Sequence, residues 1–180
     1  MHCSAYIATS LDGFIARPNG DLDWLDAAQA TVTPGEDCGY AEYMANIDAI
    51  VMGRNTYEKV RSFTPWPYNK PVYVLSNHWS ALPEDAPPSV ELFKGSCDQL
   101  VDKLSTMGQE RVYIDGGKTV QSFISAGLLD EITITTIPVL LGSGLSLFGG
   151  LAGDVRLDHL QTQSWAFGFV QSRYRLNRGV

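Results

Sequence analysis

Cysteine is scarce in this 180-residue chain, and its spacing excludes the usual structural uses of the residue. Cys3, Cys38 and Cys97 form no CxxC pair and are odd in number, so we expect neither a disulfide framework nor a structural zinc site. The three histidines are equally scattered, and no HExxH motif occurs. This sparse use of cysteine fits a reducing compartment and predicts a cytoplasmic protein.

Positive charge and long apolar runs are also in short supply. Thirteen Lys and Arg against twenty Asp and Glu give a formal net charge of −7. This balance argues against general nucleic-acid binding, which depends on cations that neutralise phosphates. Apolar runs such as Ile137–Leu141 are far shorter than the roughly 20 residues that cross a bilayer. The N-terminus also lacks the basic region and long apolar stretch of a secretory signal.

The remaining composition is that of a globular protein, with 44% hydrophobic and 18% charged residues. The length suits one domain, which we expect to span residues 1–180. Short apolar runs predict strands that are buried on both faces, as in a parallel sheet. The predicted strands are Cys3–Ala8, Ala49–Met52, Val72–Leu75, Val90–Phe93, Arg111–Ile114 and the long Glu131–Leu141. A short extended segment is also predicted at Phe14–Ala16, after the turn at residues 10–13.

Helical patterns separate these strands. Apolar residues recur with helical spacing over Tyr40–Ile47, Leu100–Met107 and Val120–Gly127, and Arg54–Val60 also has a helical pattern. In the tail, apolar and polar residues alternate around Val155–Asp158 and Val170–Leu176, which predicts two half-exposed antiparallel strands. The expected fold is a three-layer α/β/α domain with a mixed, mostly parallel sheet and antiparallel C-terminal strands.

In such a sheet, ligands and catalytic residues are expected beyond the carboxyl ends of the strands. Three of these ends have unusual residues, namely Met52–Thr56, Leu75–His78 and Ile114–Thr119. In the third, a strand leads into Gly116-Gly117-Lys118 and then a helix, a pattern that lets backbone approach an anion. A tight turn without a ligand explains the pattern equally well, since it is neither a GxGxxG nor a Walker motif.

The other two strand ends are weaker signals by themselves. Gly53 permits close approach and Arg54 can fork onto a phosphate, but a surface arginine paired with a nearby acid is the simpler explanation. A cap on a turn is a sufficient explanation for Ser76 and Asn77 taken alone. Because all three ends are expected to line one crevice with small, polar and cationic groups, their combination favours a phosphorylated nucleotide.

The proton donor is less clear from the pattern. Asp12 precedes a glycine and reads as a turn residue. Trp24 lies in a polar segment and is either a core residue or the cover of a pocket. Four acidic residues are candidates, and their spacing does not select one of them: Asp12, Asp26, Asp37 and Glu42.

Four segments in order resemble the dihydrofolate reductase-like family: Ala8–Ala16, Val51–Glu58, Pro71–Ser76 and Val112–Gly117. A fifth, Ile134–Gly144, is similar to its RibD C-terminal branch, the reductase domain of riboflavin biosynthesis. The resemblance implies an eight-stranded mixed sheet and NADPH as the hydride donor. The residues that it implies for the cofactor are Ala8, Ile15, Gly53, Arg54, Asn55, Thr56, Leu75, Ser76, Asn77, Asp115, Gly116, Gly117, Lys118, Thr119 and Val120.

The resemblance also implies what these residues do. Ala8 and Ile15 flank the nicotinamide, and Ser76 and Asn77 lie near the adenosine 2′-phosphate. The pyrophosphate lies at the segment from Gly116 to Val120, and the segment from Gly53 to Thr56 lies on the phosphate side. Trp24 lines the substrate side, and Thr135 faces the substrate. Apart from the resemblance, we expect the proton to come from water or from an acid, for which Asp12 is the candidate. The RibD branch often pairs, so a homodimer is also expected.

Two departures from the family pattern bear on function. Asn77 and His78 stand where many relatives have a cation, and no carboxylate aligns after Trp24, where Asp37 or Glu42 would have to serve. The deaminase signature of the two-step riboflavin enzyme is absent. We therefore expect an NADPH-dependent reductase of a small pterin-, pyrimidine- or sugar-like substrate, similar to 5-amino-6-(5-phosphoribosylamino)uracil reductase. A dihydrofolate reductase and a nucleotide-binding module without turnover are the alternatives.

Overall fold

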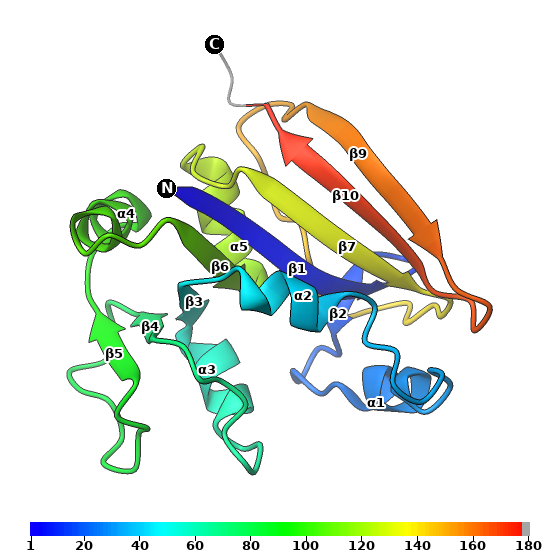
Figure 1. Ribbon diagram of the computed structural model, residues 1–180, viewed down its shortest axis with the longest axis horizontal. Coiled ribbons are helices and arrows are strands. Elements are labelled where there is room, and N and C mark those ends of the chain that lie inside the picture. The colour runs from blue at the N-terminus through cyan, green and yellow to red at the C-terminus, as the bar shows by residue number, and fades with distance from the viewer. Residues whose placement is uncertain (178–180) are drawn as a thin grey trace.

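A computed structural model describes residues 1–177 of the chain, so the last three residues of the expected 1–180 domain lie outside the description. Its centre is an eight-stranded sheet in the order β5-β4-β3-β6-β1-β7-β10-β9 (Figure 1). The strands are β1 His2–Ser10, β3 Ala49–Gly53, β4 Val72–Leu75, β5 Val90–Phe93, β6 Arg111–Asp115, β7 Glu131–Ile137, β9 Leu157–Ser164 and β10 Val170–Leu176. The helices are α1 Asp23–Gln29, α2 Tyr40–Ala45, α3 Arg54–Val60, α4 Cys97–Thr106 and α5 Gly117–Ser125.

The sheet is mixed and mostly parallel, as the sequence predicts. Strands β5, β4, β3, β6, β1 and β7 pair in parallel, whereas β10 runs antiparallel to both of its neighbours, β7 and β9. The β9–β10 hairpin turns through residues 165–169, where the alternating pattern of the tail places it. This arrangement is the expected fold with antiparallel C-terminal strands.

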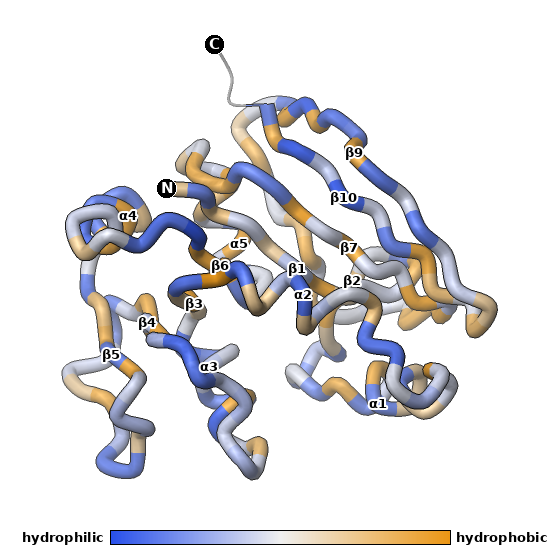
Figure 2. The backbone as a smooth tube through the Cα atoms, in the orientation of Figure 1, coloured by the Kyte–Doolittle hydropathy of each residue, from blue (hydrophilic) through white to orange (hydrophobic). Residues whose placement is uncertain are grey.

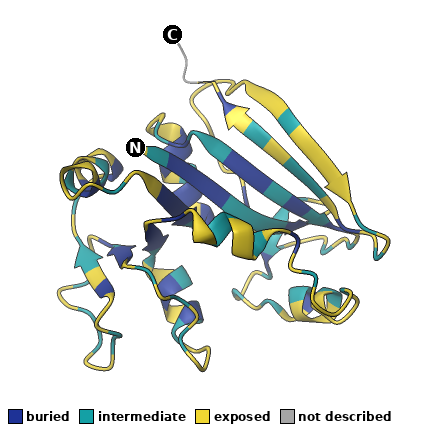
Figure 3. Cartoon of the chain, in the orientation of Figure 1, coloured by how far each residue is buried: buried dark blue, intermediate teal, exposed yellow. Residues whose placement is uncertain are grey.

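Two apolar clusters on opposite faces of the sheet make the three layers. Alternation along β3 sends Ile50 and Met52 to the face covered by α2 and α3, and Val51 to the face covered by α4 and α5. All three side chains have 0% exposure, which explains why this strand is apolar throughout. Figure 3 shows that burial decreases across the sheet, with buried residues concentrated in the central strands and the edge strand β9 almost entirely exposed.

The structure corrects two details of the sequence-based prediction. The long strand expected over Glu131–Leu141 ends at Ile137, because Pro138 has no N–H with which to continue the ladder. The first tail strand begins at Leu157 rather than near Val155. A two-stranded sheet also forms between β2 (Phe14–Ala16) and β8 (Leu145–Ser146), of which only the first strand was expected.

The hydropathy of the strands differs between the centre and the C-terminal edge of the sheet. In Figure 2 the central strands β3 and β6 are largely apolar, whereas the β9–β10 hairpin is mostly hydrophilic. Among residues 1–177, no helix has both the length and the apolar character needed to span a membrane.

Candidate functional site

The fold brings the three predicted strand ends together, because β4, β3 and β6 are neighbours in the sheet. Their last residues lie at the same level: Met52 pairs with Asp115, and Gly53 pairs with Leu75. Leu75 in turn pairs with Phe93 at the end of β5. The strand ends that the sequence could only list separately therefore form one edge of the sheet.

Two glycines let the first and third strand ends approach each other closely. A Cβ atom on Gly53 would lie 2.9 Å from Thr119 Oγ1, and one on Gly116 would lie 2.0 Å from Thr56 Oγ1. Gly116 also has a φ of +87°, which side chains rarely adopt. The contacts are reciprocal, since each strand end supplies a glycine to the other's threonine. The strand-to-helix turns after β3 and β6 thus form a single packed unit.

Two helices begin at this unit, and neither has a side-chain cap. The N-caps of α3 and α5 are Gly53 and Gly116, and within residues 1–177 neither helix has a side-chain cap hydrogen bond at this position. Arg54 and Lys118 follow, and both are exposed. Arg54 Nε donates to Asn55 Oδ1 at 3.3 Å. Unpaired N–H groups, positive helix ends and two cations at neighbouring strand ends make a surface that suits a polyanion.

The second strand end is tied to the neighbouring strand. Ser76 is 7% exposed, and its N–H donates to the Phe93 carbonyl at 3.1 Å. Asn77 Oδ1 accepts a hydrogen bond from the Gly95 N–H at 2.9 Å. The Asn77 amide therefore links the ends of β4 and β5, and its NH₂ group is the part of the side chain left to meet a ligand.

The residues expected near the nicotinamide lie on the β1 and α5 side of the same edge. A Cβ atom on Gly117 would lie 2.6 Å from Ile15 Cδ1, so these two residues are in direct contact. Ala8 pairs with Thr135 on β7. The Thr135 hydroxyl is buried and accepts a hydrogen bond from Gln171 Nε2 at 2.9 Å. In contrast, the Val120 side chain has 0% exposure and packs in the core beneath α5.

Asp12 has contacts that favour an anchoring role over proton donation. Its carboxylate accepts hydrogen bonds from Ser10 Oγ at 2.6 Å and from the backbone N–H groups of Leu141 and Gly142 at 3.1 and 2.7 Å. The Ser10 hydroxyl and these amides lower the pKa of Asp12. An ionised carboxylate with three donors around it holds the turn after β1 to the segment after β7 and is a poor source of a proton.

The acidic candidates near α2 are also accounted for. Asp37 accepts hydrogen bonds from the N–H groups of Gly39 and Ala41, at the start of α2. Glu42 is exposed on the same helix. Trp24 is 5% exposed and packs with Cys38 and Ile137, which places it in a small apolar cluster beside the strand ends. Whether Trp24 also lines the substrate side stays a prediction.

The carboxylate that does lie at the strand ends is Asp115. It ends β6, is partly buried, and its pKa is raised, chiefly because burial disfavours its charged form. The Tyr68 hydroxyl donates to Asp115 Oδ2 over a long 3.4 Å. Tyr113, on the same face of β6, donates to the Tyr6 carbonyl at 3.1 Å. Tyr68 and Tyr113 were not identified from the sequence, because only the fold brings the segment after α3 over the end of β6.

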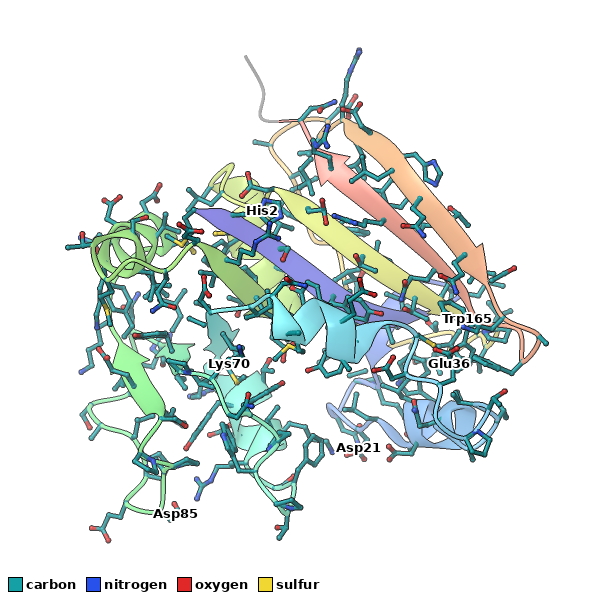
Figure 4. The ribbon with its side chains drawn as sticks, in the orientation of Figure 1. His2, Asp21, Glu36, Lys70, Asp85 and Trp165 are labelled. Carbon is teal, nitrogen blue, oxygen red and sulfur yellow. The ribbon has the colours of Figure 1, made fainter. Side chains whose placement is uncertain are left out.

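A cavity of about 440 Å³ lies away from this edge. It is a polar groove on the sheet face between α2 and the β9–β10 hairpin, lined by residues that include Glu42, Glu131 and Arg173. Figure 4 shows two further lining residues, Glu36 and Trp165, beside each other near the hairpin turn. We assign the chemistry to the strand ends because the groove is a solvated sheet face, on which Arg173 pairs with Glu131.

The fold and the strand-end geometry define a dihydrofolate reductase-like domain. The chain belongs to the RibD C-terminal domain family, whose model matches residues 3–170. It is 35% identical over 156 residues to the uncharacterized protein YwjB of Bacillus subtilis (strain 168), covering 84% of this chain and 85% of that protein.

Two solved structures illustrate the likeness. The "Putative riboflavin biosynthesis protein" of Shewanella sp. PV-4 is 39% identical, with a TM-score of 0.92 over 99% of this chain and 100% of the other. The dihydrofolate reductase of Enterococcus faecalis, complexed with NADP(H) and RAB-propyl, has a TM-score of 0.65 over 98% of this chain and 96% of the other. At 18% identity, the second likeness is one of fold alone.

Proposed function

We propose that this chain is an NADPH-dependent reductase that transfers a hydride to a small pterin-, pyrimidine- or sugar-like substrate. Membership of the RibD C-terminal domain family makes 5-amino-6-(5-phosphoribosylamino)uracil the first substrate to test. One observation carries the proposal: two helices without side-chain caps, each with a cation in its first turn, start at adjacent strand ends and pack against each other through Gly53 and Gly116.

The residues at the strand ends fit a dinucleotide phosphate. The N–H groups at the start of α3 and α5 supply hydrogen-bond donors, and Arg54 and Lys118 supply positive charge in a chain of net charge −7. When bound, NADPH supplies the hydride; the protein holds the cofactor and the substrate in register and excludes water. Ile15, in contact with Gly117, would pack beside the ring that carries the hydride.

Asp115 is the group best suited to supply the proton that accompanies the hydride. Hydride addition to a C=N or C=O bond leaves negative charge on the heteroatom, which must then be protonated. A general acid has to hold its proton near the working pH, and burial raises the pKa of Asp115 in that direction. Asp12, whose pKa is lowered, does not meet this requirement.

Binding and turnover can be tested separately. NADPH should quench the fluorescence of the four tryptophans, and addition of 5-amino-6-(5-phosphoribosylamino)uracil should then oxidise the bound NADPH. Arg54→Ala should weaken the binding of NADPH more than the binding of NADH, by roughly tenfold or more, because charge-assisted phosphate contacts contribute about 1.5–3 kcal/mol. Arg175→Ala, an exposed arginine on β10, is the matched control.

Three outcomes would count against parts of the proposal. Failure of NADPH and NADH to bind at millimolar concentration would rule out a nicotinamide nucleotide as the cofactor. Binding without oxidation across pterin, pyrimidine and sugar substrates would leave a nucleotide-binding module, and efficient oxidation by dihydrofolate alone would make the chain a dihydrofolate reductase. Equal losses for both cofactors in Arg54→Ala would show that Arg54 does not contact the 2′-phosphate.

A further inference from the structure

Gln171 is the centre of a hydrogen-bond network between the sheet and the segment that precedes α2. Its Nε2 atom lies 3.1 Å from the Cys38 carbonyl oxygen, 2.9 Å from Thr135 Oγ1 and 2.7 Å from the Tyr6 hydroxyl oxygen. Tyr6 in turn donates its own proton to the Cys38 carbonyl. Cys38 has a φ of +56°, a backbone conformation that residues other than glycine rarely adopt. The network therefore holds an unfavourable point of the chain against β1, β7 and β10.

This network lies beside the strand ends of the candidate site. Strand β1 extends beyond β6, which ends two residues after the pair between Ser4 and Tyr113. Ala8 thus lies past the end of β6, at the level of the turn into α5. It pairs with Thr135, and Thr135 pairs with Gln171, on the adjacent strands β1, β7 and β10 of Figure 1. A ligand that occupies the strand ends and reaches across β1 would meet this row of residues.

The partners of Gln171 fix the direction of each hydrogen bond. A backbone carbonyl only accepts, so the Gln171 atom that faces Cys38 must be the amide nitrogen. Burial raises the pKa of Tyr6 to about 12, so its phenol keeps the proton that it donates to Cys38. The two amide protons of Gln171 have their closest acceptors in the oxygens of Tyr6 and Thr135. Thr135 therefore receives an N–H, and among residues 1–177 its own hydroxyl proton has no acceptor.

The same part of the molecule holds a second proton without an acceptor. Trp24 is 5% exposed and packs in one cluster with Cys38 and Ala8. Within the part of the chain that the structure describes, its buried indole Nε1 has no hydrogen-bond partner. Buried polar groups in proteins normally find partners. Two donors without acceptors beside Cys38 therefore indicate a ligand that presents acceptor atoms.

We propose that Gln171 is a positioning residue that fixes Thr135 as a hydrogen-bond donor toward the substrate, so that the site selects a carbonyl oxygen over an amino group at this point. This inference rests on the proposed function and takes the substrate to lie over Ala8 and Thr135. A carbonyl oxygen accepts the Thr135 proton, whereas an amino group places a second donor against it. A site with such a fixed donor discriminates between ligands of the same shape.

The first test measures binding without turnover. With NADP⁺ in place of NADPH, 5-amino-6-(5-phosphoribosylamino)uracil is titrated into the full chain by calorimetry. Two analogues, in which one or the other ring oxo group is replaced by an amino group, are titrated in the same way. One analogue should bind roughly tenfold or more weakly than the parent compound, because its amino group meets the Thr135 proton. Equal binding of all three compounds would overturn the selection.

Variants at Gln171 separate selection from general damage. Gln171→Met keeps the length of the side chain but removes its N–H groups, so the Thr135 hydroxyl is free to rotate and to accept. The disfavoured analogue should then bind more tightly than it does to the unmodified chain, a gain that damage to the fold does not produce. Gln163→Met is the matched control, because Gln163 pairs with Gln171 across the hairpin and is exposed. If Gln171→Met keeps the original preference, Gln171 does not set it.

The second test needs no ligand. With ¹⁵N-labelled glutamine side chains, the Gln171 amide is the NMR signal that is missing from Gln171→Met. Thr135→Val removes the hydroxyl that this amide donates to, so the Gln171 signal should shift and its protons should exchange faster with water. A Gln171 signal that stays the same would contradict the hydrogen bond on which the positioning role depends.

The two tests also separate this inference from the proposed function. If neither NADPH nor NADP⁺ binds, the proposed function fails, while the NMR measurement still decides whether Gln171 fixes the Thr135 hydroxyl. If NADP⁺ binds but none of the three pyrimidines does, the selection by Thr135 is wrong while the cofactor is retained.

Discussion

At the residue scale, Asp115 should lower the stability of the folded protein as the pH rises. Because burial raises its folded-state pKa, the native protein retains a proton that the unfolded chain loses at about pH 3.9. Stability from this group therefore falls as the pH rises from that value through the folded-state pKa. Asp115→Asn lacks this loss and should gain stability relative to the unmodified protein as the pH rises above 4, while losing the proposed turnover. Thermal unfolding from pH 4 to 8 measures the difference.

The control for this prediction is Asp102→Asn, an exposed aspartate on α4. Its unfolding profile should run parallel to that of the unmodified chain. Parallel profiles for Asp115→Asn as well would mean that Asp115 ionises in the folded protein as it does in the unfolded one. That result would remove the physical basis for assigning it the proton.

Gly116 offers a second test at this scale. A Cβ atom there meets Thr56 Oγ1 at 2.0 Å on a backbone of positive φ, so Gly116→Ala should lower the free energy of unfolding by about 3 kcal/mol or more and abolish NADPH binding. Gly108 has a similar φ of +79° with open space around it, so Gly108→Ala should lower the free energy of unfolding by only about 1–2 kcal/mol. Thr56→Ala in the Gly116→Ala background should recover part of the loss. Equal losses at both glycines would show that the contact with Thr56 is unimportant.

Single residues also show where sequence reasoning reaches its limit. Gly53, Arg54, Gly116 and Lys118 could be identified as a candidate site because short patterns at strand ends have local physical meaning. The environment of Asp115 could not, because Tyr68 is 47 positions away and its hydrogen bond exists only in the folded chain. Asp12 was considered as a proton donor for the same reason, since the backbone N–H groups that bind its carboxylate lie about 130 positions along the chain.

At the scale of elements, the segment after β7 depends on Asp12. Pro138 ends the strand, and the N–H groups of Leu141 and Gly142 bind the Asp12 carboxylate instead of another strand. Because its pKa is lowered, Asp12 stabilises the fold above its unfolded pKa of about 3.9, and this contribution is lost as the pH falls through the folded value. Asp12→Asn should therefore be less stable at neutral pH, with the gap closing on acidification.

Hydrogen exchange locates this effect. The amides of Leu141 and Gly142 should exchange faster in Asp12→Asn, while amides in β3 keep their protection. Asp154→Asn, in an exposed segment, should leave both sets unchanged. Unaltered exchange at Leu141 and Gly142 would show that the carboxylate does not hold this segment, and loss of NADPH oxidation at full stability would restore Asp12 as a proton donor.

Elements differ in how far the sequence predicts them. The strands β3, β4 and β6 were predicted to within a residue, because burial on both faces leaves an uninterrupted apolar run. The end of β7 was missed because Val139-Leu140-Leu141 extends that apolar run past Pro138, although Leu140 is 69% exposed. The two-residue strand β8 was missed because its pairing with β2 depends on a contact that no local pattern encodes.

At the scale of the whole molecule, the site joins parts of the chain that fold around different strands. One side of the strand-end edge comes from β3, β4 and β6, and the other from β1 and its turn to β2. Between them, Lys59 Nζ on α3 lies 4.0 Å from Asp21 Oδ1, and Figure 4 shows Asp21 between α1 and α3. A ligand across the strand ends would therefore stabilise the molecule as a whole and not one element alone.

This coupling gives a quantitative expectation. NADPH at 100 times its dissociation constant should raise the free energy of unfolding by about 2.7 kcal/mol, or roughly 5–10 °C in Tm for a chain of this size. Hydrogen exchange in the complex should slow most at the ends of β3, β4 and β6 and at the starts of α3 and α5, and least in β9, whose residues are almost all exposed. If NADPH instead protected the β9–β10 hairpin and left the strand ends unchanged, the nucleotide would lie in the polar groove on the sheet face. The assignment of Arg54, Gly116 and Asp115 to one site would then be wrong.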